Sequence, residues 1–231
     1  MERERQVSKT PGARRIPLWL KIAYTAFLCG LVPYYLRQYG PTNFLWFCDV
    51  ALIITLVGIW TESRFLISMA SVAIVFPQLM WVADFCVRAT TGGHLIDMTE
   101  YMFDPENPLF VRGLSAFHGW MPFLLLWLLA KLGYDRRAVF AQTALCWVVL
   151  LITFLILDGP NGPAGNVNKI FGPNDAVAQT WMPHTAWLGV LILAYPVIVY
   201  LPSHLVFKRL FRKDPDYLSS SAQIQPASVG S

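Results

Sequence analysis

Six apolar stretches, each about as long as a membrane-spanning helix, constrain this chain more than any other feature. A helix needs about 20 mostly apolar residues to cross the hydrocarbon core of a bilayer. Charged residues make up only 14% of the 231 residues, too few to cover the surface of a water-soluble domain. The sequence therefore predicts an all-α fold, a polytopic membrane helix bundle with six spans at residues 17–36, 43–60, 65–87, 109–132, 137–157 and 180–207.

The spans leave no room for a separate soluble domain. We expect a basic cytoplasmic tail at residues 1–16, a transmembrane domain at 17–207, and a basic anchor followed by a disordered tail at 208–231. The composition excludes a nucleic-acid-binding domain. The four cysteines lie far apart inside apolar runs, which fits neither a disulfide framework nor a metal site, and no cofactor is expected.

The distribution of lysine and arginine predicts the orientation, because cytoplasmic segments of membrane proteins carry an excess of both. With six spans, both termini lie on the side that carries most of these residues, and we expect that side to be the cytoplasm, in a bacterial inner membrane. The long connections at 88–108 and 158–179 then face outward, and Trp46 and Trp81 near span ends fit an aromatic belt. The outer side carries only four of the 18 cationic residues: Arg37, Arg88, Arg112 and Lys169.

Titratable and amide side chains inside the spans are the candidate site residues. Such groups are costly in a membrane and usually face the protein interior. At about 1.5 Å per helical residue, Asp49 lies about 9 Å and His118 about 13 Å below the outer boundary. We therefore expect Asp49, Gln78 and His118 to converge on one cavity. The candidates share the outer half of the predicted bundle: Cys48, Asp49, Gln78, Asp84, His118 and His184.

Most of these candidates also have a structural interpretation. Asp49 and Asp84 could pair with Arg112 or with backbone donors. The amide of Gln78 could join two helices by a hydrogen bond. His184 stands at the start of a span, where it could be solvated.

His118 favours a site over plain packing. Gly119 opens space beside the imidazole, and Pro122 removes the backbone hydrogen bond to the His118 carbonyl. A loosened helix with a deep imidazole is typical of a functional position.

Four short motifs occur in the order found in a known family: Leu45-Trp-Phe-Cys48-Asp49, Phe76-Pro77-Gln78 with Asp84, Phe117-His118-Gly119 and Asn168-Lys-Ile-Phe-Gly-Pro173. Over residues 44–173 the chain resembles the YwaF-type bacterial integral membrane proteins, and still more closely a bacterial group described only as membrane-associated. The resemblance implies a phospholipid acyltransferase with a Cys and a His, as in a eukaryotic relative. More distant androgen-induced-gene-like proteins imply an intramembrane lipid-ester hydrolase with a Thr and a His. Two departures are an acidic insert at 94–104 and the lack of the family's early histidine within 17–36.

By this resemblance, the family's cysteine, histidine and asparagine fall on Cys48, His118 and Asn168. A Cys48 thiolate would attack an acyl carbonyl, and His118 would activate the thiol and shuttle a proton. Asp49 would orient the imidazole or balance its charge, as the third member of a catalytic triad does. Gln78 and Asn168 would donate hydrogen bonds to the oxyanion. The substrate-binding candidates are Gln78, Asp84, Asn168 and His184.

Three other functions stay open. A transporter or channel would use Asp49, Asp84 and His118 as an ion relay, although the inner half of the bundle is apolar and no repeated halves occur. A haem protein would need His118 and His184, whose depths differ by about 10 Å. A scaffold or assembly factor would need no chemistry. Membrane lipids are the expected partners, and the sequence indicates no particular protein partner.

Overall fold

The computed structural model describes residues 16–174 and 177–211, and every regular element within these ranges is a helix. The all-α prediction is therefore confirmed. The predicted N-terminal tail up to residue 15 and the predicted disordered tail beyond residue 211 lie outside the described residues. The elements are α1 (Leu18–Tyr39), η1 (Pro41–Leu45), α2 (Phe47–Thr61), α3 (Arg64–Thr91), η2 (Glu100–Met102), α4 (Leu109–Ser115), α5 (Phe117–Leu132), α6 (Ala138–Ile156), η3 (Val167–Lys169), α7 (His184–Ala194), η4 (Tyr195–Tyr200) and α8 (Leu201–Leu210).

Four helical stretches among the described residues are long and apolar enough to cross a membrane: Arg64–Thr91, Leu109–Leu132, Ala138–Ile156 and His184–Leu210. α2 is apolar but only 15 residues long, and η1 precedes it within the second predicted span. α1 has 22 residues but is less apolar than these four. The helices are compatible with an integral membrane protein.

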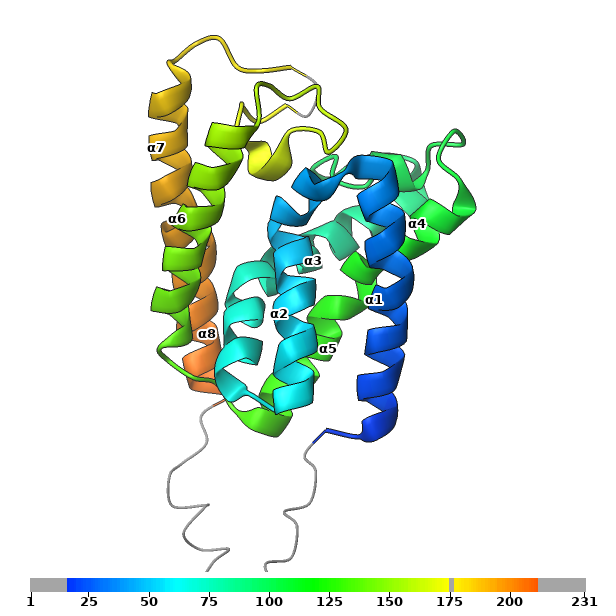
Figure 1. Cartoon of the computed structure of the whole chain (residues 1–231), viewed down its shortest axis with the longest axis vertical. Coiled ribbons are helices and arrows are strands. Elements are labelled where there is room, and N and C mark those ends of the chain that lie inside the picture. The colour runs from blue at the N-terminus through cyan, green and yellow to red at the C-terminus, as the bar shows by residue number, and fades with distance from the viewer. Residues whose placement is uncertain (1–15, 175–176, 212–231) are drawn as a thin grey trace, which may run out of the picture.

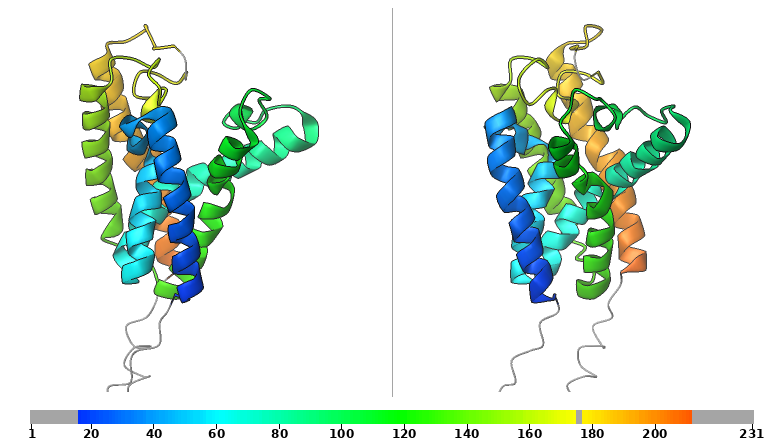
Figure 2. Two further views of the ribbon diagram at one scale, coloured as in Figure 1. Left: turned by 45° about the vertical axis from the view of Figure 1, so that its right-hand side comes forward. Right: turned by 90° about the vertical axis from the view of Figure 1, so that its right-hand side faces the viewer.

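The central helix of the bundle is α3, which packs against α2, α5 and α6. Its residues are buried without interruption from Ile67 to Val75, as expected for a helix surrounded by others. The C-terminal half of α3 leans away from α6 and α7 and, together with α4, forms an arm (Figure 2). Pro77 lies inside α3 and cannot donate a hydrogen bond to the Ala73 carbonyl, which permits a bend there.

The two ends of the bundle differ. The start of α1 and the end of α8 lie at one end, and the loops at 92–108, 157–174 and 177–183 lie at the other (Figure 1). We call the second end the loop end. The first described residue and the last are thus on the same side of the bundle, opposite the two long loops.

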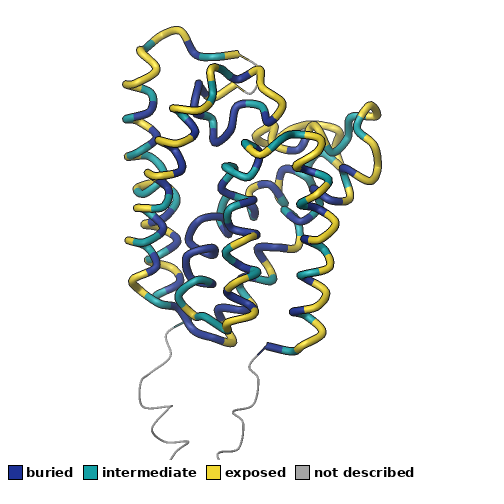
Figure 3. The backbone as a smooth tube through the Cα atoms, viewed as in Figure 1, coloured by how far each residue is buried: buried dark blue, intermediate teal, exposed yellow. Residues whose placement is uncertain are grey.

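Large apolar side chains are exposed on the outer faces of the helices, whereas several polar side chains are buried inside (Figure 3). Soluble monomers rarely expose extended apolar surface. The arrangement therefore fits contact with lipid. Strongly exposed examples are Trp19, Phe140, Leu155, Leu193 and Ile198.

The last helical stretch is interrupted by η4, a π-helical segment at Tyr195–Tyr200. Pro196 has no N–H to donate to the Ile192 carbonyl, four residues earlier. The indole Nε1–H of Trp147 on α6 donates to that carbonyl instead, at 2.9 Å. A side chain of the neighbouring helix thus satisfies the backbone group that the proline leaves open.

A buried ion pair fixes α1 to the turn between α2 and α3. The Lys21 Nζ atom lies 2.8 Å from Glu62 Oε1, and Lys21 is 5% exposed. The backbone N–H of Ile16 donates to the same oxygen. Glu62 has a left-handed backbone (φ 51°) that ends α2, so its position is set by the turn.

The substitution Glu62→Gln should lower the thermal midpoint of the detergent-solubilised protein, because the buried Lys21 ammonium would face an uncharged amide. We expect a cost of about 1–3 kcal/mol, since the Glu62 side chain is 22% exposed and the pair is not fully buried. The double variant Lys21→Met/Glu62→Gln should recover part of this loss.

The matched control is Arg137→Met, which breaks a pair with Asp135 in which the arginine side chain is 81% exposed. Exposed pairs contribute little, so the thermal midpoint should hardly change. Equal effects of Glu62→Gln and Arg137→Met would contradict the structural role of the buried pair.

Candidate functional site

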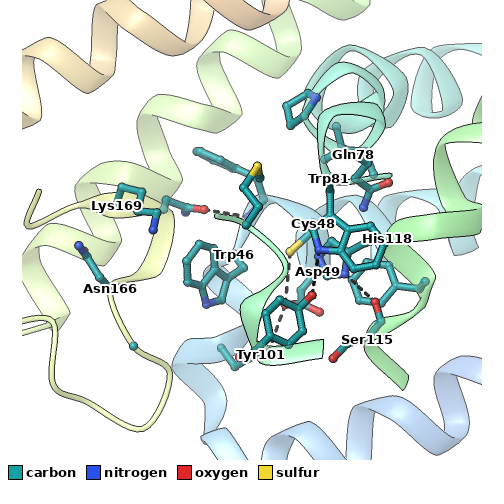
Figure 4. Close-up of a pocket in the computed structure, with 18 of the residues that line it drawn as sticks. Trp46, Cys48, Asp49, Gln78, Trp81, Tyr101, Ser115, His118, Asn166 and Lys169 are labelled. Atoms are coloured by element: carbon teal, nitrogen blue, oxygen red, sulfur yellow. Dashed lines mark hydrogen bonds between the residues drawn. The ribbon is translucent and has the colours of Figure 1, made fainter. Parts of the chain in front are cut away.

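A cavity of about 790 Å³ lies at the loop end of the bundle (Figure 4). Its walls come from α1, η1, α2, α3, the 92–108 loop, α4, α5, the loop around η3, and η4. This volume is typical of small-molecule sites, which measure about 300–1,000 Å³. The cavity brings together five of the seven candidates: Cys48, Asp49, Gln78, His118 and Asn168.

The first turn of α2 carries two of these residues, Cys48 and Asp49. Asp49 is 3% exposed, and its Oδ2 atom accepts hydrogen bonds from Asn43 Nδ2 at 3.2 Å and from the Cys48 thiol at 3.9 Å. Its Oδ1 atom is buried and has no hydrogen-bond partner in the part of the chain that the structure describes. The partial positive charge of a helix N-terminus favours negative charge at both positions.

Asn168 holds the start of α2 in place. Its Oδ1 atom accepts a hydrogen bond from the Phe47 N–H at 3.0 Å, and its Nδ2 atom donates to the Leu45 carbonyl at 2.7 Å. Asn168 has a left-handed backbone (φ 52°), which asparagine adopts more readily than most residues. Its amide is thus bonded at both ends to backbone, and the structure gives Asn168 a positioning role.

His118 follows a break between α4 and α5. The Gly119 N–H donates to the Ala116 carbonyl at 2.9 Å, and the Ser115 carbonyl accepts a hydrogen bond from His118 Nδ1 at 2.8 Å. A carbonyl only accepts, so Nδ1 carries the hydrogen and Nε2 keeps a lone pair. The Trp81 ring stacks on the imidazole with centroids 5.5 Å apart, which further fixes its orientation.

The group that orients the imidazole is therefore the Ser115 carbonyl. The sequence predicted Asp49 for this role, but no hydrogen bond joins Asp49 to His118 within residues 16–174 and 177–211. Nor does a hydrogen bond join His118 to Cys48, whose thiol contacts Asp49. The pairing of Cys48 with His118 stays a prediction, with both side chains on the wall of one cavity.

Gln78 and Arg112 bring polar atoms to the cavity that have no hydrogen-bond partner among the described residues. Gln78 is 3% exposed, and both its Oε1 and its Nε2 atoms are buried and unpartnered. The Nε atom of Arg112 is also unpartnered, although its Nη1 donates to the Met102 carbonyl. Leaving such groups unpaired costs free energy, so native proteins seldom do it away from functional sites. These atoms point to a polar ligand.

Asp84 does not line the cavity. Its carboxylate is 0% exposed and accepts four hydrogen bonds of 2.7–2.9 Å from the loop that follows α3. The structural alternative, pairing with backbone donors, matches this geometry, whereas Arg112 forms no ion pair with Asp84 or Asp49 among the described residues. The four donors are the N–H groups of Leu95, Ile96 and Met98 and the hydroxyl of Thr99.

His184 also lies outside the cavity lining, at the start of α7. Its ring contacts Phe171 with centroids 6.0 Å apart. The structure thus separates His184 and Asp84 from the five candidates that share the cavity.

Sequence reasoning missed three side chains that shape the site: Trp81, Tyr101 and Asn43. Trp81 lies three residues after Gln78, a spacing that places both on one helix face, but its place near a span end suggested an aromatic belt. Its Nε1–H donates to the Tyr101 hydroxyl at 3.1 Å. Tyr101 lies in a loop between two predicted spans, and Asn43 lies in η1 at the start of the second predicted span, so helical spacing gives no signal for either.

The chain matches no family model, no curated protein and no solved structure. The resemblance to YwaF-type proteins stays a prediction that depends on the four motifs.

The variants Gln78→Met and Asn168→Gly should differ in their effects on stability. Asn168→Gly keeps the left-handed backbone accessible but removes two hydrogen bonds, and should cost about 1–3 kcal/mol. Gln78→Met removes a buried amide without partners, so the thermal midpoint should stay equal or rise. Thermal unfolding in detergent measures both. A loss of stability in Gln78→Met as large as that in Asn168→Gly would show that the Gln78 amide has a structural partner.

Proposed function

We propose that the chain is a six-span integral membrane protein with both termini in the cytoplasm, and that it transfers or hydrolyses an acyl ester of a lipid. Support for six spans comes from α1 and from η1 with α2, which occupy the first and second predicted spans beside the four long apolar stretches. Support for the orientation comes from the excess of lysine and arginine on the side of the termini. The cavity then lies in the outer half of the membrane.

The observation that carries the proposed chemistry is the set of three side chains that line the cavity. A thiol on Cys48, an imidazole on His118 with its Nε2 lone pair available, and the unpartnered amide of Gln78 line the same space. A nucleophile, a base and an oxyanion donor are the groups that acyl transfer requires. The apolar surroundings of the bundle would admit acyl chains.

In the proposed reaction, His118 Nε2 takes the proton of the Cys48 thiol. The sulfur forms a bond to the ester carbonyl carbon, and the Gln78 Nε2–H donates to the oxyanion. The ester C–O bond breaks, the alcohol leaves with the proton from His118, and a thioester remains on Cys48. Water or a second alcohol then attacks the thioester, and the thiol regains its proton.

The topology can be tested with reporter fusions. Fusions after Asn107 and after Asp175 should report export, and fusions after Arg64, after Arg137 and at the C-terminus should report the cytoplasm. The reason is that the proposed inner side carries most of the cationic residues. A cytoplasmic signal after Asn107 would contradict the six-span topology.

Acyl transfer can be tested with a lipid ester whose acyl chain carries an alkyne tag. The wild-type protein should acquire a tag that neutral hydroxylamine removes, because a thioester is labile to this reagent. Cys48→Ala and His118→Ala should each abolish the tag without lowering protein abundance. Lipid analysis of cells with and without the protein should identify the ester that is consumed.

Matched controls come from the other cysteines. Cys86→Ala and Cys146→Ala should retain the tag, since neither residue lines the cavity. A tag that persists in Cys48→Ala would refute the proposed nucleophile. A protein that never acquires a tag and alters no lipid would favour the scaffold interpretation.

A further inference from the structure

We propose that the cavity binds an organic ammonium group, which pairs with the Asp49 carboxylate inside aromatic walls. The proposal rests on the proposed function only where it names this cation as the headgroup of the lipid substrate. The binding itself follows from the charge and the side chains of the cavity.

The first observation is a buried carboxylate without a cationic partner. Asp49 is 3% exposed, and its Oδ1 atom has no hydrogen-bond partner among residues 16–174 and 177–211. The other charged side chains of the cavity are Asp97, Arg112 and Lys169, and no ion pair within 4 Å joins Asp49 to a cationic group of the part of the chain that the structure describes. A buried charge is expensive unless it is paired, so a cationic ligand would complete this site.

The second observation is the aromatic character of the walls. Aromatic side chains line the same cavity as Asp49, and Figure 4 shows Trp46, Trp81 and Tyr101 among them. Aromatic rings attract ammonium cations through the negative potential of their faces, and cages of such rings bind quaternary ammonium ligands. Six of the aromatic residues of the wall are Tyr35, Trp46, Phe47, Trp81, Tyr101 and Tyr195.

An inorganic cation fits the same cavity less well. Calcium takes about 6–8 oxygen ligands, but the cavity offers only two buried and unpartnered side-chain oxygens, Asp49 Oδ1 and Gln78 Oε1, among the residues described. A volume of about 790 Å³ also exceeds what a bare ion needs. A bulky cation whose methyl groups contact the rings satisfies both the charge and the space.

The two oxygens of Asp49 then have separate partners. Oδ2 is occupied by the Asn43 amide and the Cys48 thiol, whereas Oδ1 is open. An ammonium group at Oδ1 would lie beside the proposed nucleophile without displacing the contacts that Oδ2 already makes. An anionic group next to the ammonium could approach the unpartnered Nε atom of Arg112.

The test is equilibrium dialysis of labelled choline against the full chain in dodecyl maltoside, with dodecylphosphocholine added to the micelles in a parallel arm. Binding of choline would show that the free cation is sufficient for recognition. Binding of dodecylphosphocholine without binding of choline would show that the cation must be part of a lipid headgroup. Asp49→Asn should weaken binding about tenfold or more, since it removes the paired charge. The matched carboxylate control is Asp135→Asn, which lies outside the cavity and should bind like the wild type.

A second pair of variants keeps the test decisive if Asp49→Asn does not fold. Tyr101 is 36% exposed, so substitution there is tolerable. Tyr101→Leu should bind choline about threefold or more weakly than Tyr101→Phe, because only the phenylalanine variant keeps an aromatic ring at this position. Equal binding by both variants would contradict the aromatic contribution.

Other outcomes would overturn the proposal. These are no binding of choline or dodecylphosphocholine, equal binding of the neutral isostere 3,3-dimethylbutan-1-ol, or displacement of choline by sodium at equal concentration. Dialysis measures binding without turnover and can be repeated in Cys48→Ala. Choline binding without acyl tagging would refute the acyl transfer but support this inference, and tagging without binding of either ligand would do the reverse.

Discussion

In an apolar environment, a backbone N–H or C=O group without a partner costs several kcal/mol, so each irregular stretch of backbone must be satisfied by other groups of the protein. This chain does so with side chains at several breaks. Trp147 bonds to the carbonyl that Pro196 leaves open, and His118 bonds to the carbonyl of Ser115. Asn168 bonds to both backbone groups that flank Trp46. The cavity depends on the last two contacts, because they fix the start of α2 and the imidazole.

The helical content and the approximate extent of the apolar stretches follow from the sequence alone, since stretch length and hydropathy do not depend on the neighbours. The meeting of Asp49, Gln78 and His118 at one cavity could likewise be predicted, because buried polar groups at similar depth in a bundle tend to face one another. The number of spans and the direction of insertion differ from the helical content in what determines them. They depend on the membrane and on the cell, and the fold of the chain does not decide them.

The roles of single side chains were harder to predict, because they depend on where the backbone departs from regular helix. Pro122 suggested a loosened helix at His118, but the break lies at Ala116, and its position decides that Ser115 and not Asp49 orients the imidazole. Asn168 resembled an oxyanion donor in sequence, yet its contacts span more than a hundred residues of chain to reach α2. Such contacts have no local signature.

The four hydrogen bonds at Asp84 have a mechanical consequence. They tie residues 95–99 to the C-terminal half of α3, so this part of the loop and this part of the helix would move as one rigid unit. Ile96 and Met98 form part of the cavity wall, so a displacement of the C-terminal half of α3 would carry them with it. Because Pro77 weakens α3 closer to its N-terminus than Asp84, the C-terminal half of the helix would pivot at Pro77, inside the bundle. The width of the cavity entrance would then be set by the tilt of a helix, and the loop that borders the cavity would follow the motion of the helix.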